Sequence, residues 1–369
     1  MPKVALVKCS SYNTEEIYQK VQSLIDLLGG IKSFIRSGQK VLIKPNILAP
    51  FKIERAATTH PAMVEAAILL VKQSGGKPYV GESPGAGSAE YCAKAAGILD
   101  ICKKHRVRFV DLKTPVEVEN PQGQRFKKIY IAKEIDEFDA IINVPKWKTH
   151  GLTSITGAVK NLYGCVPGLL KSQYHYKIRT RPEFCELIID IYRFFKEKVK
   201  LCILDGVVAM EGEGPSAGNP YPLGLIGIST DQMAVDQVFS EICGIDPKSV
   251  PIIEYQKDIE VIGEKIRAPG FKYYESLPEG VLHLGLLGQI LNIFFREKPV
   301  ILENKCTKCA TCVMVCASRA ILNEMKIDYG KCVRCFCCAE FCPEKAIIIK
   351  RNPAIHFINR LLQSLPIPG

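Results

Sequence analysis

The chain lacks any strongly apolar run of the length that a membrane-spanning helix needs. Its most membrane-like stretch, Gly280–Phe295, is uncharged but is interrupted by His283, Gln289 and Asn292, and it falls short of the about 20 residues required. We interpret it as a buried or interfacial helix, which leaves contact with a membrane surface open. The first residues, Met1–Lys8, are typical of a strand and lack the apolar run of a signal peptide. The sequence therefore predicts a cytoplasmic protein.

Nucleotide-binding motifs are also missing. No G-x-x-x-x-G-K-[ST] segment occurs, and no G-x-G-x-x-G lies between a strand and a helix, so the motifs support neither ATP nor NAD. The 49 basic and 38 acidic side chains give a formal charge of +11 without a long basic block. This distribution does not favour nucleic acid; a small anionic substrate or an acidic redox partner protein suits it better.

One residue type is abundant, because the chain contains 16 cysteines. Two runs share the spacing C-x2-C-x2-C-x3-C at an offset of 26 positions, and they are Cys306, Cys309, Cys312, Cys316 and then Cys332, Cys335, Cys338, Cys342. This spacing binds [4Fe-4S] clusters. The neighbouring pairs Ile301/Ile327 and Ile321/Ile347 repeat at the same offset, which indicates an internal duplication. The sequence predicts two [4Fe-4S] clusters and electron transfer.

The fourth cysteine of such a run normally binds the cluster of the other run. We therefore assign Cys306, Cys309, Cys312 and Cys342 to cluster I, and Cys332, Cys335, Cys338 and Cys316 to cluster II. Zinc is the competing metal, since zinc ribbons also use paired C-x2-C elements, but the duplicated spacing favours clusters. Cys337 is an extra thiol, which we interpret as a packed bystander. The other cysteines stand singly in apolar or helical patterns and are predicted to be reduced, buried thiols in a reducing compartment.

Before residue 280, short β-branched runs alternate with helical patterns. Strands are expected at 4–7, 41–43, 78–81, 109–112, 140–144 and 201–208, and helices at 14–28, from 61 onward, at 89–105 and at 182–196. This alternation predicts an α/β domain with a mainly parallel sheet that helices cover on both faces. Ligands of such sheets bind at the carboxyl ends of the strands.

Polar residues gather after several of these strands. They are Lys44, Asn46, Lys146, Lys148, His150, Lys160, Asn161 and Asp205, with His175 assigned to the same region. We predict a site for a carboxylate or phosphate, in which Lys146 and Lys148 neutralise the ligand and His150 exchanges a proton. The glycines at 151, 157, 164 and 168 would let the backbone approach it. The alternative is that the lysines are solvated loop residues and the glycines only form turns.

Two acids in a glycine-rich loop, Glu211 and Glu213, complete the predicted polar wall. Glu211 is a candidate general base, while Lys44, Asn46, Lys160, Asn161, Asp205 and Glu213 are candidates for binding a cofactor or substrate. A structural turn explains the loop almost as well.

These residues also carry a resemblance to a known family. The segments are Val41–Asn46, Thr58–Pro61, Gly81–Gly85, Ile142–Gly151, Gly157–Gly164 and Asp205–Pro215. They resemble the domain of unknown function 362, in the form fused to a ferredoxin domain. The resemblance implies a prokaryotic iron–sulfur protein, and it implies no catalytic residues because the family has no established general activity.

The sequence thus predicts an α/β domain at 1–279, an apolar linker helix at 280–300, a two-cluster ferredoxin domain of bacterial type at 301–351 and an amphipathic segment at 352–369. The favoured function is an oxidoreductase that passes electrons between the clusters and an anion at the strand ends. A flavin would connect one-electron and two-electron chemistry, but no residue specifies one. The alternatives are a non-catalytic electron carrier and a protein that senses or assembles metallocofactors.

Overall fold

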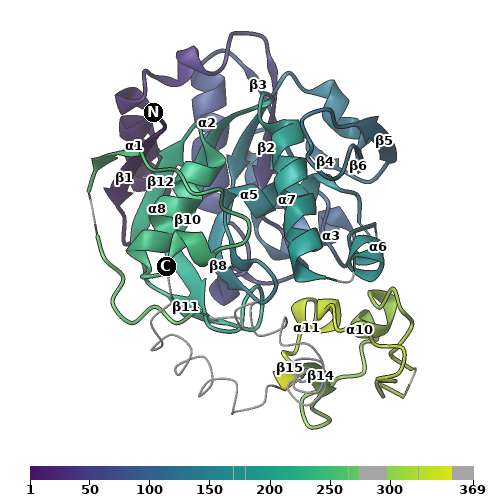
Figure 1. The fold of residues 1–369 in the computed structure, drawn as a ribbon. Coiled ribbons are helices and arrows are strands. Elements are labelled where there is room, and N and C mark those ends of the chain that lie inside the picture. The colour runs from purple at the N-terminus through teal and green to yellow at the C-terminus, as the bar shows by residue number, and fades with distance from the viewer. Residues whose placement is uncertain (169, 179, 265, 274–296, 323, 351–369) are drawn as a thin grey trace. The chain divides into compact units, whose positions relative to one another are not determined.

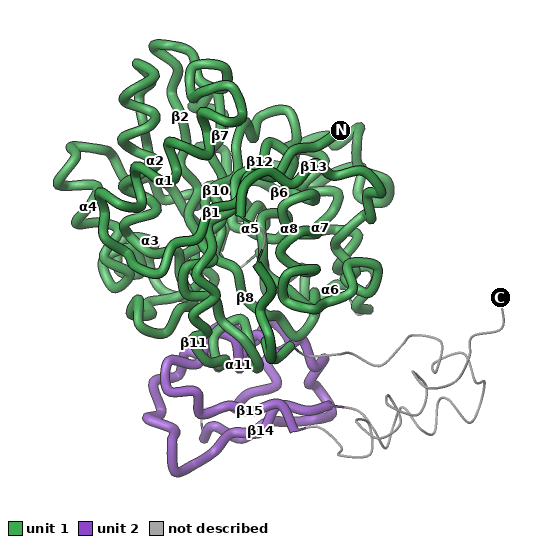
Figure 2. Tube along the Cα trace, turned by 90° about the vertical axis from the view of Figure 1, so that its left-hand side faces the viewer, with its two compact units in different colours: residues 1–274 green, residues 275–369 purple. Residues whose placement is uncertain are grey.

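The computed structural model describes residues 1–168, 170–178, 180–264, 266–273, 297–322 and 324–350. The chain divides into two compact units, unit 1 (Met1–Tyr274) and unit 2 (Glu275–Gly369), which Figure 2 distinguishes by colour. The predicted linker helix lies mostly outside the described residues, and the predicted segment 352–369 lies wholly outside them. Within the described residues, no helix is both long enough and apolar enough to cross a membrane.

Unit 1 is built on a central sheet whose main path runs β13-β1-β12-β10-β7-β2-β3-β4. Figure 1 labels most of these strands, and Figure 2 labels β7 and β13. Neighbours are parallel except at β12, which is antiparallel to both β1 and β10. The strands are β1 (Lys3–Lys8), β2 (Lys40–Pro45), β3 (Lys77–Glu82), β4 (Phe109–Asp111), β7 (Ala140–Val144), β10 (Val199–Glu211), β12 (Leu225–Ser229) and β13 (Glu260–Gly263). The mainly parallel sheet predicted from the sequence is confirmed.

Three further strands extend this sheet beside β10, and a separate hairpin accompanies it. They are β8 (Lys146–His150), β9 (Ser154–Thr156) and β11 (Asn219–Tyr221), with the hairpin formed by β5 (Pro115–Glu119) and β6 (Lys128–Ala132). Sequence patterns predicted none of these five strands. The segment expected to be a polar loop after β7 is therefore itself a strand, β8, which pairs with β10.

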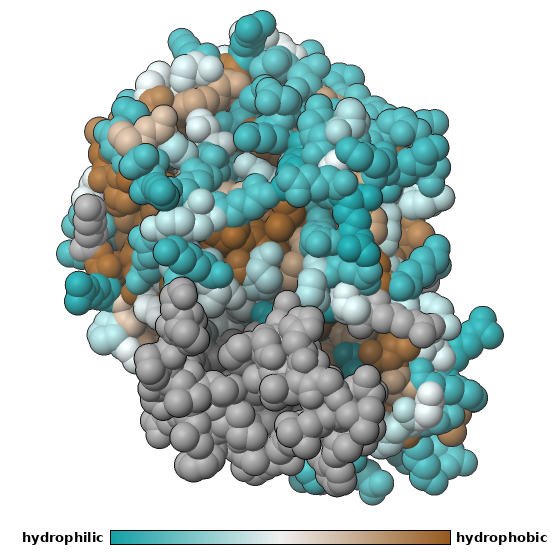
Figure 3. Space-filling view, viewed as in Figure 1, coloured by the Kyte–Doolittle hydropathy of each residue, from teal (hydrophilic) through white to brown (hydrophobic). Residues whose placement is uncertain are grey.

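Helices cover both faces of the sheet, and successive strand residues point to opposite faces. Val41 and Ile43 of β2 pack in the cluster that includes α1 and α2, whereas Leu42 packs in the cluster that includes α7 and α8. The helices are α1 (Thr14–Leu27), α2 (Pro61–Gln73), α3 (Ala89–Ala95), α4 (Ile98–Lys104), α5 (Ala158–Asn161), α6 (Leu170–Lys177), α7 (Arg181–Phe195) and α8 (Gln232–Ile242). Figure 3 shows many hydrophilic residues on the visible surface of unit 1, as expected when the apolar ones fill these two layers.

The segment predicted to be one helix, Ala89–His105, forms two helices. α3 ends at Ala95 and α4 begins at Ile98, because Gly97 between them adopts a left-handed conformation with φ of 70°. A β-carbon at Gly97 would come within 3.1 Å of the Pro61 ring. The break therefore lets this turn lie against the start of α2.

Unit 2 repeats its backbone as well as its cysteines. Its elements are β14 (Lys298–Ile301), α10 (Thr311–Met314), α11 (Cys337–Glu340) and β15 (Ile347–Lys350). α10 and α11 begin 26 residues apart, at 311 and 337. Left-handed residues recur at the same offset, in the pairs Lys308/Arg334, Ala310/Phe336 and Arg319/Lys345. The duplication predicted from the sequence is thus a structural repeat.

The two halves of unit 2 are interleaved. Ile301 pairs with Ile347 in the β14–β15 ladder, and Ile321 pairs with Ile327 in an isolated bridge. Because 301 corresponds to 327 and 321 corresponds to 347, each pairing joins the first half to the second. Among the described residues, both halves also contribute to one small hydrophobic cluster.

Candidate functional site

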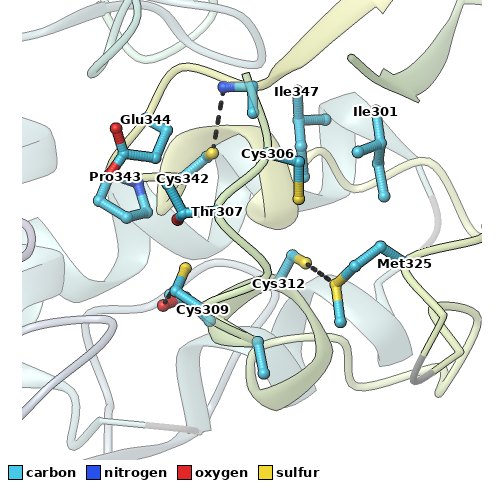
Figure 4. Close-up of a pocket in the computed structure, with 13 residues that line it drawn as sticks. Ile301, Cys306, Thr307, Cys309, Cys312, Met325, Cys342, Pro343, Glu344 and Ile347 are labelled. Carbon is cyan, nitrogen blue, oxygen red and sulfur yellow. Dashed lines mark hydrogen bonds between the residues drawn. The ribbon is translucent and has the colours of Figure 1, made fainter. Parts of the chain in front are cut away.

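The first cavity of unit 2 is lined by four cysteines from both sequence runs. Cys306, Cys309 and Cys312 come from the first run, and Cys342 comes from the second (Figure 4). Apolar side chains, including Met325, form much of the remaining lining, together with Thr307, Thr311 and Glu344. The loop between the cysteines turns back on itself because residues 308 and 310 have positive φ. This is the set of cysteines that the sequence assigned to cluster I.

The second cavity is lined by the remaining cysteines of the two runs. Cys332, Cys335 and Cys338 come from the second run, and Cys316 comes from the first. A further thiol, that of Cys337, lines the same cavity and is buried. Each cavity thus combines three cysteines of one run with the fourth cysteine of the other run. This arrangement follows from the interleaving of the two halves.

The backbone around the fourth cysteines suits thiolate ligands. The N–H of Ala320 donates to Cys316 Sγ at 3.3 Å, and the N–H of Ala346 donates to Cys342 Sγ at 3.2 Å, at equivalent positions of the two halves. Such hydrogen bonds stabilise negative charge on sulfur. Burial raises the pKa of the Cys338 thiol well above its usual value, and the nearby Cys335 and Cys332 raise it further. Bound iron would offset that penalty, because coordination favours the thiolate.

The spread of these cysteines bears on the kind of metal group that fits. Among the described residues, no three His, Cys, Asp or Glu side chains converge closely enough to hold a single metal ion. A zinc ion draws four sulfurs to about 2.3 Å from one point, whereas the cysteines of a [4Fe-4S] cluster each bind a different iron. Each cavity provides four cysteines of the predicted set, which is the number of protein ligands that one [4Fe-4S] cluster requires.

In unit 1, the predicted lysines are buried rather than solvated. Lys44, Lys146 and Lys148 are at most 2% exposed, so the interpretation of these residues as solvated loop lysines is wrong. The reason is that Lys44 is the penultimate residue of β2 and the other two lie in β8, inside the sheet. A buried ammonium group needs a partner, and each of these lysines has one.

Lys146 belongs to a buried group centred on Asp205. Its Nζ donates to Asp205 Oδ2 at 2.9 Å and to the Tyr12 hydroxyl at 2.8 Å, while that hydroxyl donates to Asp205 Oδ1 at 2.7 Å. The backbone N–H of His60 also donates to Asp205, and the His60 ring stacks on Tyr12 at 3.6 Å. Burial lowers the pKa of Lys146 although Asp205 acts in the opposite direction. Asp205 lies within β10, because that strand continues to Glu211.

Lys44 has a different carboxylate partner, Glu82 at the end of β3. The Nζ–Oε2 distance is 2.6 Å, and Glu82 also accepts from the N–H groups of Ile47 and Ser83. Sequence reasoning gave Glu82 no role, although it lies in the quoted segment Gly81–Gly85. The register of parallel β2 and β3 could have indicated the pair, since it brings their carboxyl ends side by side.

An amide network adjoins Lys44. Asn161 Nδ2 donates to the Lys44 carbonyl at 3.1 Å and to Asn143 Oδ1 at 2.7 Å, and Asn46 Nδ2 donates to Asn161 Oδ1 at 3.0 Å. These bonds connect β2, β7 and α5. The predicted residues Lys44, Asn46 and Asn161 are thus brought together, and Asn143 is a member that the sequence did not single out.

His150 lies near several basic side chains of unit 1. Burial holds its pKa well below the usual value, and the charges of Lys160, His175, Lys148 and Arg181 lower it further. Its Nδ1 accepts from the N–H of Leu152 at 3.0 Å, which leaves Nε2 as the protonated nitrogen of a neutral ring. The geometry therefore favours a role for His150 as a hydrogen-bond donor rather than as a group that transfers protons. The prediction that Lys148, His150 and Lys160 gather with His175 agrees with these interactions.

Two of the predicted glycines serve the packing of the protein itself. A β-carbon at Gly157 would collide with Asp236, whose carboxylate accepts from the N–H groups of Ala158 and Val159 at 2.6 and 2.9 Å. The start of α5 is therefore occupied by a side chain of α8, which sequence reasoning did not identify. A β-carbon at Gly164 would collide with Lys44 and Glu82. Close approach to a bound group is not what these two positions require.

Neither of the two predicted acids is fully buried, and Glu211 is the last residue of β10. Glu211 is half-buried and accepts from the backbone N–H of Lys272 at 2.7 Å. Glu213 is exposed. The loop itself is joined to β8, because Thr149 Oγ1 donates to the Gly212 carbonyl at 2.9 Å and accepts from the Gly214 N–H. These contacts describe a loop that is attached to the edge of the predicted site through its backbone.

Comparison with known proteins covers the same region. The family described as "Domain of unknown function (DUF362)" matches residues 41–241, a range that includes every predicted strand-end residue and ends before the cysteine runs. The thylakoid-associated protein sll1697 of Synechocystis sp. is 33% identical over 255 residues, which cover 69% of this chain and 78% of that protein.

Proposed function

Because the chain belongs to the DUF362 family, a family of unknown function, its activity has to follow from its own residues, and we propose that it is an iron–sulfur redox protein. In this proposal, residues 301–351 form a ferredoxin domain of bacterial type with two [4Fe-4S] clusters. When bound, the clusters would supply one-electron transfer.

The observation that carries the proposal is which cysteines line each of the two cavities. Each is lined by three cysteines of one run and the fourth cysteine of the other. This exchange of the fourth ligand is the arrangement of two-cluster ferredoxins that have the C-x2-C-x2-C-x3-C spacing. The repeated hydrogen bonds to Cys316 and Cys342 support the same assignment.

The cationic region around His150 is the proposed substrate end of the redox chain. His150 would donate a hydrogen bond from Nε2, and Lys148 and Lys160 would stabilise a negatively charged carboxylate or phosphate group. Tethering an electron-transfer domain to such a site raises the effective concentration of the donor. The proposed enzyme class is therefore an oxidoreductase that acts on a small anion.

A non-catalytic electron carrier is the second candidate, and the buried ion pairs favour it. Glu82 and Asp205 already balance the charges of Lys44 and Lys146. These two lysines should therefore attract an anionic substrate less strongly than the sequence predicted. In this reading unit 1 would bind a protein partner. The name of the Synechocystis relative associates that protein with the thylakoid, so a partner at a membrane surface belongs to this second proposal.

Anaerobic purification with iron and sulfide analysis tests the iron–sulfur proposal. We expect about eight iron and eight sulfide per chain, and a reduced protein with the electron paramagnetic resonance signal of [4Fe-4S] clusters. Stoichiometric zinc without sulfide would contradict it.

A thermal-shift experiment with inorganic phosphate separates the two candidates. Binding only to the folded state raises its stability, so phosphate should stabilise the wild type and lose this effect in His150→Phe and Lys160→Gln. Tyr130→Phe, an exposed change on the hairpin, is the control. Equal stabilisation of all four proteins would remove the anion site and leave the electron carrier.

A further inference from the structure

The second cysteine cavity contains one thiol more than the first. Cys337 is 1% exposed and lines this cavity together with Cys316, Cys332, Cys335 and Cys338. It is the first residue of α11 and follows Phe336, whose φ is +61°. This left-handed turn directs the chain back toward the cavity after Cys335.

The internal repeat supplies a natural comparison. The residue equivalent to Cys337 in the first half is Thr311, the first residue of α10. Its hydroxyl lies 3.4 Å from Cys309 Sγ. In the second half, Cys337 and Cys335 line the same cavity, as Thr311 and Cys309 do in the first. Both halves therefore place a side chain of this position in the cavity with the second cysteine of the run, but only the second half places a sulfur there.

We propose that Cys337 is a reserve ligand of cluster II, which can take the place of Cys335 on the same iron. This inference rests on the proposed iron–sulfur function. A thiolate is needed for iron coordination, and a threonine hydroxyl at position 311 cannot serve in that way. The backbone needs little rearrangement, because both side chains already line the same cavity and only one residue separates them in the sequence.

The exchange leaves charge and oxidation state unchanged. The bond between iron and Cys335 Sγ breaks as the bond between iron and Cys337 Sγ forms, and the Cys337 thiol proton passes to Cys335. No electron is gained or lost, so the exchange needs no oxidant or reductant. Cluster I lacks this alternative because Thr311 has no thiol.

Matched alanine variants of the intact chain test the inference. Cys335→Ala should retain the iron and sulfide content of the wild type, at about eight of each, whereas Cys309→Ala should fall to about half. The double variant Cys335→Ala/Cys337→Ala should also fall to about half. Cys337→Ala alone should remain full, because Cys335 is then present.

A variant that gains a ligand shows whether iron loss in Cys309→Ala comes from the missing ligand or from misfolding. Cys309→Ala/Thr311→Cys transfers the arrangement of the second half to the first and should restore the iron lost in Cys309→Ala. Equal loss in Cys335→Ala and Cys309→Ala would overturn the inference while the wild-type content still supports the iron–sulfur function. A wild type without iron and sulfide would instead overturn the function itself.

Discussion

The two units reach a folded state by different means. Unit 1 has two extensive hydrophobic clusters, one on each face of its sheet, and it satisfies its buried charges with its own side chains. Of the seven buried members of the unit 2 cluster, three are cysteines that line the two cavities. A segment as short as 297–350 buries little apolar surface and is expected to be only marginally stable alone. Unit 1 is therefore expected to be self-sufficient, and unit 2 to depend on what its cysteines bind.

Removing the bound metal groups should give the largest difference between the units. Chelation of iron under anaerobic conditions, or the double change Cys316→Ser/Cys342→Ser, should unfold unit 2 completely because metal binding and folding are coupled. Unit 1 should keep its structure. Limited proteolysis followed by mass spectrometry would show cleavage confined to 297–350.

Cys9→Ser is the control for the cysteine replacements. Cys9 is a buried thiol of unit 1 that donates to the Ser11 carbonyl, a bond that serine can also make. It should leave the cleavage pattern unchanged. Protection of unit 2 after complete loss of iron would show that the contrast between the units is mistaken.

The second largest effect is expected from the ion pair inside unit 1. Asp205→Ala leaves Lys146 buried without its carboxylate and should lower the free energy of unfolding of unit 1 by about 3–5 kcal/mol. Urea unfolding followed by far-ultraviolet circular dichroism measures this loss. The cluster absorbance at low urea should stay at the wild-type level, because unit 2 contributes no atom to the pair.

A double variant shows whether the loss comes from the unpaired charge. Lys146→Met/Asp205→Ala removes both charges and should lose less stability than the two single changes together. Additive losses would indicate that packing, and not charge, sets the stability of this part of unit 1.

The same contrast explains what the sequence could predict. The cysteine grouping was assigned from spacing alone, because a cluster loop is local and its crossed fourth ligand follows from the duplication. The buried strands β1, β2, β3 and β7 were also assigned, since runs such as Val41–Ile43 have a single interpretation. Ion-pair partners are different. Lys146 finds Asp205 only because β8 lies beside β10, and β8 has too polar a sequence to be recognised as a buried strand.

Gly97 and Asp236 illustrate the same limit. The apolar pattern continues through 89–105, so the break depends on a left-handed glycine beside Pro61 of another helix. Asp236 lies in α8, whose start, capped by Asp231, was not assigned from the sequence. Its role at the start of α5 depends on two elements that are distant in sequence. Tertiary contacts decided each of these features.

A pH experiment tests the cost of burying the Lys171 ammonium group in unit 1. Burial lowers the pKa of Lys171 to about 7, and Lys44 and Lys160 lower it further while Glu82 opposes them. In the unfolded chain its pKa is about 10.4. Between these values the unfolded state binds more protons, so this lysine makes the free energy of unfolding rise with pH, by up to about 1.4 kcal/mol per unit.

The prediction concerns the difference between the wild type and Lys171→Met. Buried thiols such as Cys165, whose pKa burial raises to about 12, titrate in the opposite sense and are common to both proteins. The difference in unfolding free energy between the wild type and Lys171→Met should therefore change by about 1.4 kcal/mol between pH 8 and pH 9. The exposed change Lys103→Met should show no such dependence. Parallel curves for the wild type and Lys171→Met would show that the lysine is neutral or charged equally in both states.

The smallest effect is expected from a single hydroxyl in unit 1. Tyr12→Phe retains the stack on His60 but removes the hydroxyl that donates to Asp205 and accepts from Lys146 and the Val208 N–H. We expect a loss of about 1–2 kcal/mol in urea unfolding, because the remaining donors still serve the carboxylate. Tyr18→Phe on the adjoining helix is the control. A loss as large as that of Asp205→Ala would mean that the hydroxyl, and not the ion pair, organises this buried group, and that unit 1 depends on its N-terminal loop more than its layered core implies.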